Sequence, residues 1–164
     1  MSQIITCPCG CNHSFEISRD FEKYEMIVSR LTKGETAKKG EKGFDVIGQD
    51  GTKFQVKYSN EIKTSSGSQW IWHGNLSDVG CDFFVLFGID KHNDFMFLIP
   101  ETEIKKRALV RNHSNIKNSQ YQVGVSAGPN SWIWNYKVSP ERFMTRLYYL
   151  KDMKQAEMIF SGGI

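Results

Sequence analysis

The stretch GFDVIGQDGTKFQVKYSN, at Gly43–Asn60, decides the fold that this sequence predicts. Its Asp50-Gly51 pair is a strong signal for a tight hairpin turn, and the residues on both sides have the composition of strands. After the turn, apolar and polar residues alternate, so that Phe54, Val56 and Tyr58 share one face. The stretch therefore predicts a β-hairpin with one apolar face and one polar face.

The polar face of this hairpin carries three residues that suit phosphodiester chemistry. Gln55 and Lys57 are two positions apart on the second strand, so their side chains emerge on the same face about 7 Å apart. The turn brings Asp45 on the first strand close to both. A carboxylate can hold a divalent metal, and a lysine beside it can assist at the water or the phosphate. A solvated hairpin edge carrying the same polar residues is the alternative.

The hairpin resembles the active-site hairpin of the PD-(D/E)XK nuclease superfamily, which has the restriction-endonuclease-like fold. The family pattern is an Asp, a hairpin turn and then Asp/Glu-x-Lys. On this resemblance Asp45 is the metal-binding aspartate, Lys57 is the catalytic lysine, and Gln55 stands at the second carboxylate position, as in the Mrr-like branch. The resemblance implies Mg²⁺ or Mn²⁺ bound by Asp45, Gln55 and the backbone carbonyl of Val56.

The resemblance extends over roughly Phe21 to Ile104. Family members carry a glutamate on the helix before the hairpin, and Glu25 is the first choice for it, with Glu22 as the alternative. The family's third and fourth strands resemble CDFFVLFGIDKHNDFMFLIPETEI.

The remaining pattern predicts helices that flank a mixed sheet. Its fold class is α/β or α+β, with a single nuclease-like domain over residues 1–164 and a Cys-rich arm over residues 1–17. A polar loop is expected at residues 60–69. The helices are expected at Ser18–Lys33, Glu101–Val110 and Ser139–Met158, and the further strands at residues 81–90, 95–100, 121–126 and 132–138.

The N-terminal arm offers a second candidate metal site. Cys7, Cys9, Cys11 and His13 are zinc ligands by type, although their spacing is too tight for all four to surround one ion. Distant residues such as Cys81 or His73 could complete a zinc site. The alternative is an arm whose thiols stay reduced in the cytosol.

Two WIW tripeptides, Trp70–Trp72 and Trp132–Trp134, are expected on strands. Their tryptophans either pack over the sheet or offer a platform on which nucleobases stack.

The charge of the chain is unevenly distributed. Ile104–Lys151 carries nine Lys or Arg side chains and one acid, Glu141, for a net charge of +8, so the rest of the chain sums to −5 against a total of +3. A basic segment beside an acidic one suits a protein that cleaves a polyanion, although a solvated basic surface is the alternative. The residues expected to bind nucleic acid are Lys105, Lys106, Arg107, Arg111, Lys117, Arg142 and Arg146.

Together these features predict a metal-dependent DNA endonuclease that acts as a homodimer, since one site cuts one strand. The alternatives are a non-catalytic nucleic-acid-binding module of the same fold and a zinc-stabilised interaction domain. No phosphate-loop, dinucleotide or nucleophile-elbow motif is present, so we expect no nucleotide cofactor. No apolar run approaches the roughly 18–20 residues that span a bilayer, and the start lacks the layout of a secretory signal. We therefore expect a cytoplasmic protein without a membrane partner.

Overall fold

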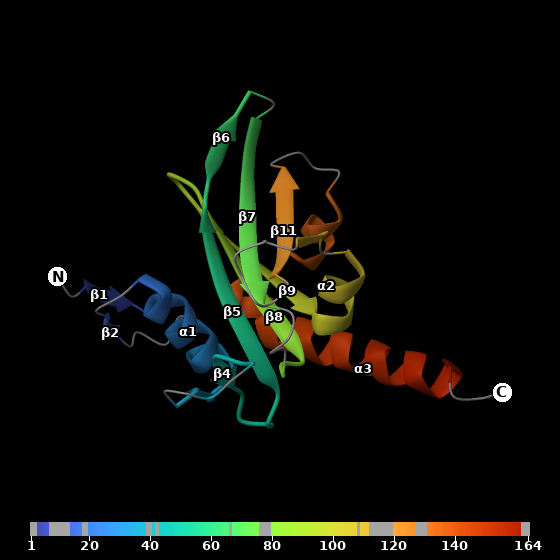
Figure 1. Cartoon of the computed structure of the whole chain (residues 1–164). Coiled ribbons are helices and arrows are strands. Elements are labelled where there is room, and N and C mark those ends of the chain that lie inside the picture. The colour runs from blue at the N-terminus through green and yellow to red at the C-terminus, as the bar shows by residue number, and fades with distance from the viewer. Residues whose placement is uncertain are drawn as a thin grey trace.

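The computed structural model describes residues 3–6, 14–17, 20–38, 41, 43–65, 67–75, 80–107, 109–111, 120–126 and 131–161. These residues form an α+β architecture in which a mixed sheet carries helices on one face and a second sheet on the other (Figure 1). The predicted α+β class is confirmed.

The mixed sheet has five strands, in the spatial order β3-β4-β5-β8-β9. β5 and β8 are parallel, and the other neighbouring pairs are antiparallel. β8 is central and its first six residues are buried, which explains its unbroken apolar composition. The strands are β3 (Glu35–Thr36), β4 (Val46–Ile47), β5 (Lys53–Asn60), β8 (Phe83–Ile89) and β9 (Asp94–Pro100).

A four-stranded sheet, in the order β10-β11-β7-β6, packs over this mixed sheet. Its strands are β10 (Leu109–Arg111), β11 (Gln120–Ser126), β7 (Gly67–Asn75) and β6 (Ile62–Thr64). The polar loop expected at residues 60–69 is therefore wrong, because β6 and β7 form a hairpin there. Polar side chains suit these strands because much of the hairpin is exposed to solvent. In the N-terminal arm, β1 (Gln3–Thr6) and β2 (Ser14–Ile17) form a separate antiparallel pair.

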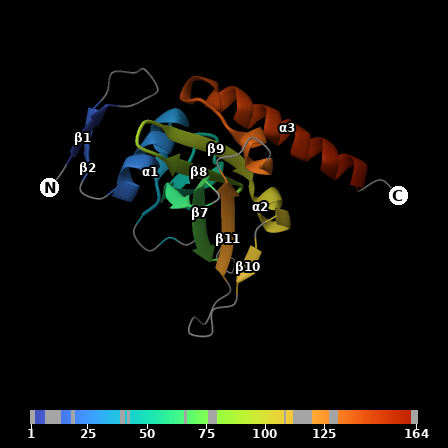
Figure 2. The same cartoon turned by 90° about the horizontal axis from the view of Figure 1, so that it is seen from above.

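The two faces of the mixed sheet are covered by different elements (Figure 2). α1 (Asp20–Leu31) and α3 (Phe143–Ser161) cover the face that carries Phe54 and Val56. β7, α2 (Glu101–Arg107) and the 3₁₀ helix η1 (Trp132–Tyr136) cover the opposite face. Since side chains alternate along β5, the polar residues Gln55 and Lys57 lie on this second face.

The predicted helix before the hairpin is confirmed, and its C-terminus explains why a glycine follows it. Lys33 adopts a left-handed conformation with φ of 50°, and Gly34 N–H donates to the Ser29 carbonyl at 2.8 Å. At Gly34 a Cβ atom would lie 2.1 Å from the Ile47 carbonyl oxygen. The glycine therefore permits close approach to β4, while Lys33 supplies the left-handed turn. Ser18, the expected cap, lies outside the described residues.

The strand expected at residues 132–138 is wrong. Residues Trp132–Tyr136 form η1, and only Lys137 pairs with β9, in an isolated bridge to Phe97. The Trp134 ring packs edge-on against Trp70, Phe95 and Phe97, which folds the chain onto this aromatic cluster instead of along the sheet edge. Tertiary packing therefore overrides the strand-like composition.

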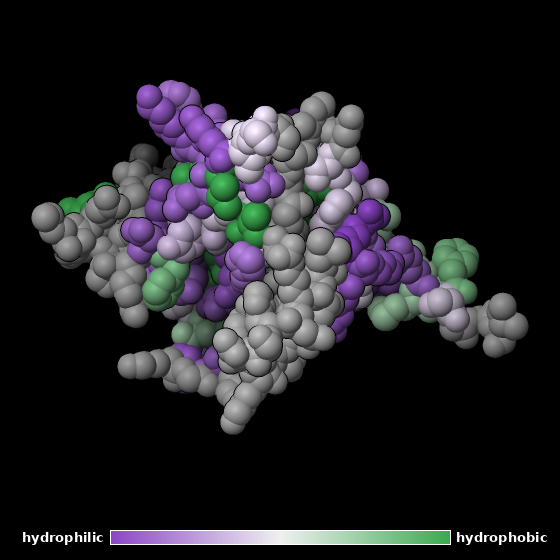
Figure 3. Space-filling view, turned by 45° about the horizontal axis from the view of Figure 1, so that its top comes forward, coloured by the Kyte–Doolittle hydropathy of each residue, from purple (hydrophilic) through white to green (hydrophobic). Residues whose placement is uncertain are grey.

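The predicted terminal helix is confirmed, but its start differs in detail. A 3₁₀ turn, η2 (Pro140–Arg142), precedes α3, and the expected Ser139 side-chain cap makes no capping hydrogen bond. The first half of α3 supplies its core residues Phe143, Leu147 and Leu150. Its last turns project from the body with apolar side chains exposed, Phe160 to 84% (Figure 3). Among the helices of the described part of the chain, none combines the length and apolar character needed to cross a bilayer.

Trp70 and Trp72 are core residues. They are buried against β8 and β9, and their indole N–H groups donate to the Ile89 and Phe87 carbonyls at 3.0 and 2.9 Å. The packing interpretation of these two tryptophans is confirmed, because their indole rings are not available for stacking bases.

Candidate active site

The predicted hairpin forms between β4 and β5, with Val46 opposite Phe54 and Ile47 opposite Lys53. Its turn closes through a bond from Gly51 N–H to the Gly48 carbonyl at 2.9 Å. Gly51 has a φ of 83°, which a residue with a Cβ atom rarely adopts. This register fixes which side chains of β5 face Asp45.

Asp45 lies where β4 stops pairing with β5. Its own backbone N–H donates to the Phe54 carbonyl at 2.8 Å. Its side chain then takes the place of the next strand residue, because the carboxylate Oδ2 accepts the Val56 backbone N–H at 2.8 Å. The same oxygen accepts the Gln55 amide Nε2 at 2.5 Å. The structure therefore brings Asp45, Gln55 and Val56 together.

Burial raises the pKa of the Asp45 carboxyl above its ordinary value, and two weaker effects oppose it. These are the Val56 N–H bond and the positive charge of Lys57, both of which favour the ionised carboxylate. Lys57 thus acts electrostatically on Asp45, and the predicted cluster of acid, amide and ammonium is present.

The orientation of the Gln55 amide matters for metal binding. Its nitrogen faces Asp45, so its oxygen would reach a shared cation only after rotation of the amide group. The Val56 N–H points to the β4 side of β5, and the carbonyl of a strand residue points to the same side as its N–H. The Val56 carbonyl is therefore directed toward the region of Asp45, as the sequence predicts for a ligand.

The two candidate acids on α1 are three residues apart, so they lie about 60° apart on the same side of the helix. Glu25 is one turn before Ser29, whose hydroxyl donates to the Gly34 carbonyl at 2.8 Å next to β3. Glu22 is nearly opposite the buried residue Tyr24 on the helix surface. Both acids therefore lie on the side of α1 that carries Ser29, and Glu25 is the nearer of the two to the buried face of the helix.

The predicted zinc ligands are not brought together in the described structure. Cys7, Cys9, Cys11 and His13 lie outside the described residues. Among the residues that are described, no three His, Cys, Asp or Glu side chains gather as a metal site. Burial, followed by the negative charge of Glu101, raises the pKa of the Cys81 thiol to about 12, so this thiol stays protonated.

The basic segment is distributed over several elements, and many of its charges have partners within the chain. On α2, Arg107 and Lys106 pair with Glu103 at 2.9 and 3.2 Å, and Lys105 pairs with Glu101. Hydrogen bonding to Arg107 lowers the pKa of the Glu103 carboxyl.

The predicted nucleic-acid-binding residues outside α2 lie on several different elements. Arg146 donates to the Asn135 carbonyl at 3.0 Å, and Arg142 ends η2 with its side chain exposed. Arg111 is the last residue of β10, and Lys117 lies outside the described residues.

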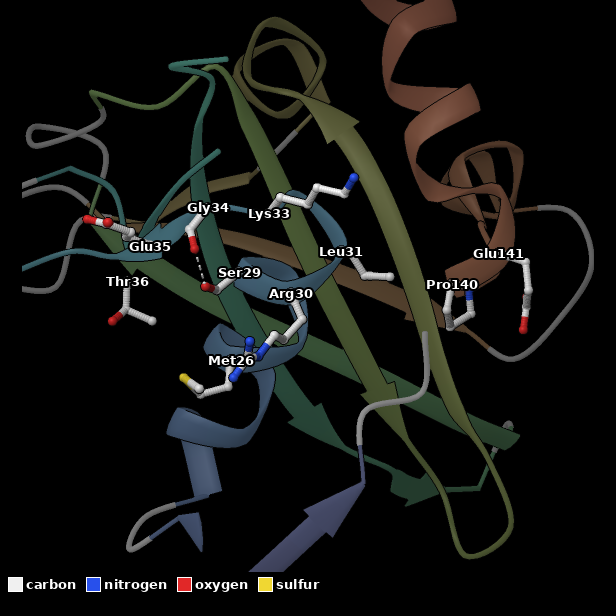
Figure 4. A pocket seen from close by; sticks show the side chains of 10 residues that line it. All are labelled: Met26, Ser29, Arg30, Leu31, Lys33, Gly34, Glu35, Thr36, Pro140 and Glu141. Carbon is white, nitrogen blue, oxygen red and sulfur yellow. Dashed lines mark hydrogen bonds between the residues drawn. The ribbon is translucent and has the colours of Figure 1, made fainter. Parts of the chain in front are cut away.

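A hollow of about 970 Å³ lies elsewhere, at the C-terminal end of α1 (Figure 4). Arg30 and Thr36 line one side of it, and Pro140 and Glu141 lie across from them. Asp45, Gln55 and Lys57 are not among its lining residues. The hollow therefore belongs to a different face from the polar cluster.

The position of β7 beside β5 is a feature of the site that sequence reasoning missed. Ile71 backbone N–H donates to the Ser59 hydroxyl at 3.0 Å, so β7 runs along the polar face of β5. The alternation of tryptophans with other residues in QWIWH was the available signal, but it does not say which strand lies alongside.

No protein-family model matches the chain, and no curated protein matches it. What the site can do chemically is therefore inferred from its own residues. Their arrangement offers one desolvated carboxylate, one amide and one ammonium on a rigid hairpin.

Proposed function

We propose that the protein is a metal-dependent DNA endonuclease of restriction-endonuclease-like fold, which hydrolyses phosphodiester bonds. The observation that carries this proposal is the convergence of Asp45, Gln55 and Lys57 on the polar face of the β4–β5 hairpin. A solvated edge gains nothing from a partly buried carboxylate, since burial penalises the charged form. A desolvated acid beside a specific cationic partner is instead typical of functional sites.

The donors at this place fit a hard divalent cation such as Mg²⁺ or Mn²⁺. Asp45 offers carboxylate oxygens, Gln55 an amide oxygen after rotation, and Val56 a backbone carbonyl, all of which are oxygen ligands. Such an ion, when bound, supplies positive charge to the phosphate and lowers the pKa of a water molecule. The raised pKa of Asp45 supports this fit, because a neighbouring cation would offset the cost of ionising a buried acid.

Lys57 would act on the substrate. Its ammonium group lies on the same face as Gln55, two residues along β5, so it can donate to a phosphate oxygen or orient the attacking water. Glu25 is the proposed second acid, because it lies nearer to the buried face of α1 than Glu22 does.

Double-stranded DNA is the proposed substrate and a homodimer the proposed active form, since each site cuts one strand. Phosphate contacts are proposed for basic residues outside the hairpin, which would make binding strongly dependent on salt. These residues are Lys105, Lys106, Arg107, Arg111, Lys117, Arg142 and Arg146.

The test is cleavage of supercoiled plasmid by the purified chain with millimolar Mg²⁺ and with EDTA. Asp45→Asn and Lys57→Ala should each lower the cleavage rate by at least about 100-fold, because each removes a charge that acts on the phosphate or its metal. Lys63→Ala, which removes an exposed lysine on the neighbouring β6, is the matched control and should cleave like wild type.

Full activity of either hairpin variant would overturn the assignment of the site. If the wild type binds DNA but cleaves it under no metal condition, the non-catalytic binding module is the correct interpretation. Thermal melting of all variants distinguishes lost chemistry from lost folding.

A further inference from the structure

We propose that His73 is a phosphate-contacting residue of the same site, supplied by β7 rather than by the hairpin. This inference rests on the proposed function, because it adds His73 to Lys57 as a second side chain that contacts a phosphate of the bound DNA strand. The observations that carry it are the register of β7 over β5 and the exposure of His73.

Two independent contacts fix this register. Ile71 backbone N–H donates to the Ser59 hydroxyl at 3.0 Å. Trp72 indole N–H donates to the Phe87 carbonyl at 2.9 Å, and Phe87 is the partner of Tyr58 in the β5–β8 pair. Taken together, the two contacts show that one step forward along β7, from Ile71 to Trp72, corresponds to one step back along β5, from Ser59 to Tyr58.

One further step places His73 level with Lys57. Both sets of contacts give the same result, because Ile71 is level with Ser59 and Trp72 with Tyr58. Lys57 rises from β5 on the face that β7 borders. A phosphate held at Lys57 is therefore at the same height along the strands as His73.

The side chain of His73 points away from the core. Trp72 before it is buried at 1% exposure, and side chains alternate along a strand, so His73 lies on the outer face and is exposed. No packing role accounts for an imidazole there. An imidazole N–H can donate to a phosphate oxygen, as the backbone-positioning residues of nucleic-acid-binding proteins do.

This arrangement defines a path for the substrate. A strand whose scissile phosphate lies over Asp45 and Lys57 would continue across the outer face of β7. The next polar side chain on that face is Gln69, two pairs of residues away from His73. We therefore assign His73 a positioning role toward the phosphate, distinct from metal binding.

The experiment measures binding separately from cleavage. Anisotropy of a fluorescein-labelled 20-mer duplex, titrated with the full chain in Ca²⁺ or EDTA, gives Kd for the wild type, His73→Ala, His73→Gln and Lys57→Ala. His73→Ala should raise Kd about tenfold, as loss of one hydrogen bond to a charged group does. His73→Gln, which keeps an N–H donor, should stay within about twofold of wild type.

His92→Ala is the matched control. His92 is also an exposed histidine, but it lies in the turn between β8 and β9, and its backbone N–H rather than its ring bonds to Asp90 at 2.7 Å. Its Kd should equal that of the wild type.

The outcomes separate the two proposals. If Lys57→Ala weakens binding while His73→Ala does not, the inference about His73 is overturned and the proposed nuclease site stands. If His73→Ala and His73→Gln weaken binding equally, a hydrogen-bond role is excluded and the inference is also overturned. If the wild type binds no nucleic acid, both the inference about His73 and the proposed function are overturned.

Discussion

At the scale of single residues, the polar cluster is defined by what Asp45 accepts. Its Oδ2 oxygen receives both the Gln55 amide and the Val56 N–H, so the carboxylate is held in one orientation. The amide at position 55 adds a ligand atom but no negative charge. Under the proposed function, attraction of a divalent cation would therefore depend on Asp45 and on any acid that α1 contributes.

Gln55→Glu should lower the Mg²⁺ concentration at which cleavage is half-maximal. A second carboxylate adds a unit of negative charge beside Asp45, which strengthens attraction for the cation. The measurement is the cleavage rate against Mg²⁺ concentration for wild type and variant. An unchanged Mg²⁺ dependence in a folded and active variant would show that position 55 does not face the metal.

Glu25→Gln should remove most of the activity, because under the proposed function Glu25 supplies the second negative charge of the site. Glu22→Gln is the matched control, since it makes the same change about one turn earlier, at a position nearly opposite the buried Tyr24. The same Mg²⁺ titration applies to both variants. Activity lost in Glu22→Gln and kept in Glu25→Gln would reverse the assignment.

At the scale of elements, α3 is tied to the turn of the β4–β5 hairpin. Lys151 Nζ donates to the Asp50 carboxylate at 2.7 Å and to the Thr52 hydroxyl at 2.9 Å. This hydrogen bond lowers the pKa of Asp50 to about 2. These two hydrogen bonds join residues about a hundred positions apart, and they hold the turn of the hairpin against α3.

Asp50→Asn should lower stability at pH 7 by about 1 kcal/mol or less, since both side chains are about one-third exposed and solvent screens the pair. The Asp50 pKa is depressed in the folded state. Its contribution is therefore complete above the unfolded pKa of about 3.9 and is lost as the pH falls toward about 2. Urea unfolding of wild type and variant at pH 7 and pH 2.5 checks this. A stability difference that does not shrink on acidification would mean that ionisation of Asp50 is not its cause.

Gly34→Ala should destabilise the protein more than Gly51→Ala does. The new Cβ at position 34 would meet the Ile47 carbonyl, whereas at position 51 it meets nothing within 4 Å and only the backbone angle is strained. We expect a loss of more than about 2 kcal/mol for Gly34→Ala and of about 1 kcal/mol for Gly51→Ala. Urea unfolding at pH 7 measures both, and equal losses would contradict the close approach of α1 and β4.

At the scale of the whole molecule, the basic segment is distributed over elements that cover opposite faces of the mixed sheet. α2 and β10 lie with the four-stranded sheet, whereas α1 and α3 lie across the mixed sheet (Figure 2). Arg107 of α2 and Arg146 of α3 nevertheless both act electrostatically on Tyr136, so basic side chains of these two elements come near each other there. The contribution of each element to binding has to be tested separately.

Charge reversal at Arg107 and Arg111 should weaken DNA binding for all sequences and reduce the slope of log affinity against log salt by roughly two, if each contacts one phosphate. Anisotropy at several salt concentrations measures the slope. Charge reversal at Arg30 and Lys33, which are exposed at the end of α1, is the matched control with the same change in net charge. Equal slopes in both double variants would mean that only overall charge matters.

The sequence by itself determined the elements whose signals are local. The hairpin around Asp50-Gly51, the buried strand β8, the return in β9 and the helices α1 and α3 follow from turn chemistry and from periodicity, which neighbouring residues set. It also placed Asp45, Gln55 and Lys57 together, since a two-stranded turn fixes which side chains face each other.

Only the tertiary structure decided the elements whose conformation depends on distant partners. η1 has the composition of a strand but folds onto Trp70 and Phe97, and the β6–β7 hairpin looks polar because its exposed side chains face solvent. The same applies to His73, which is 16 residues from Lys57 in sequence and level with it through contacts made by Ser59 and Phe87. Such placement arises because buried area and long-range hydrogen bonds select among local conformations that the sequence leaves nearly equal in free energy.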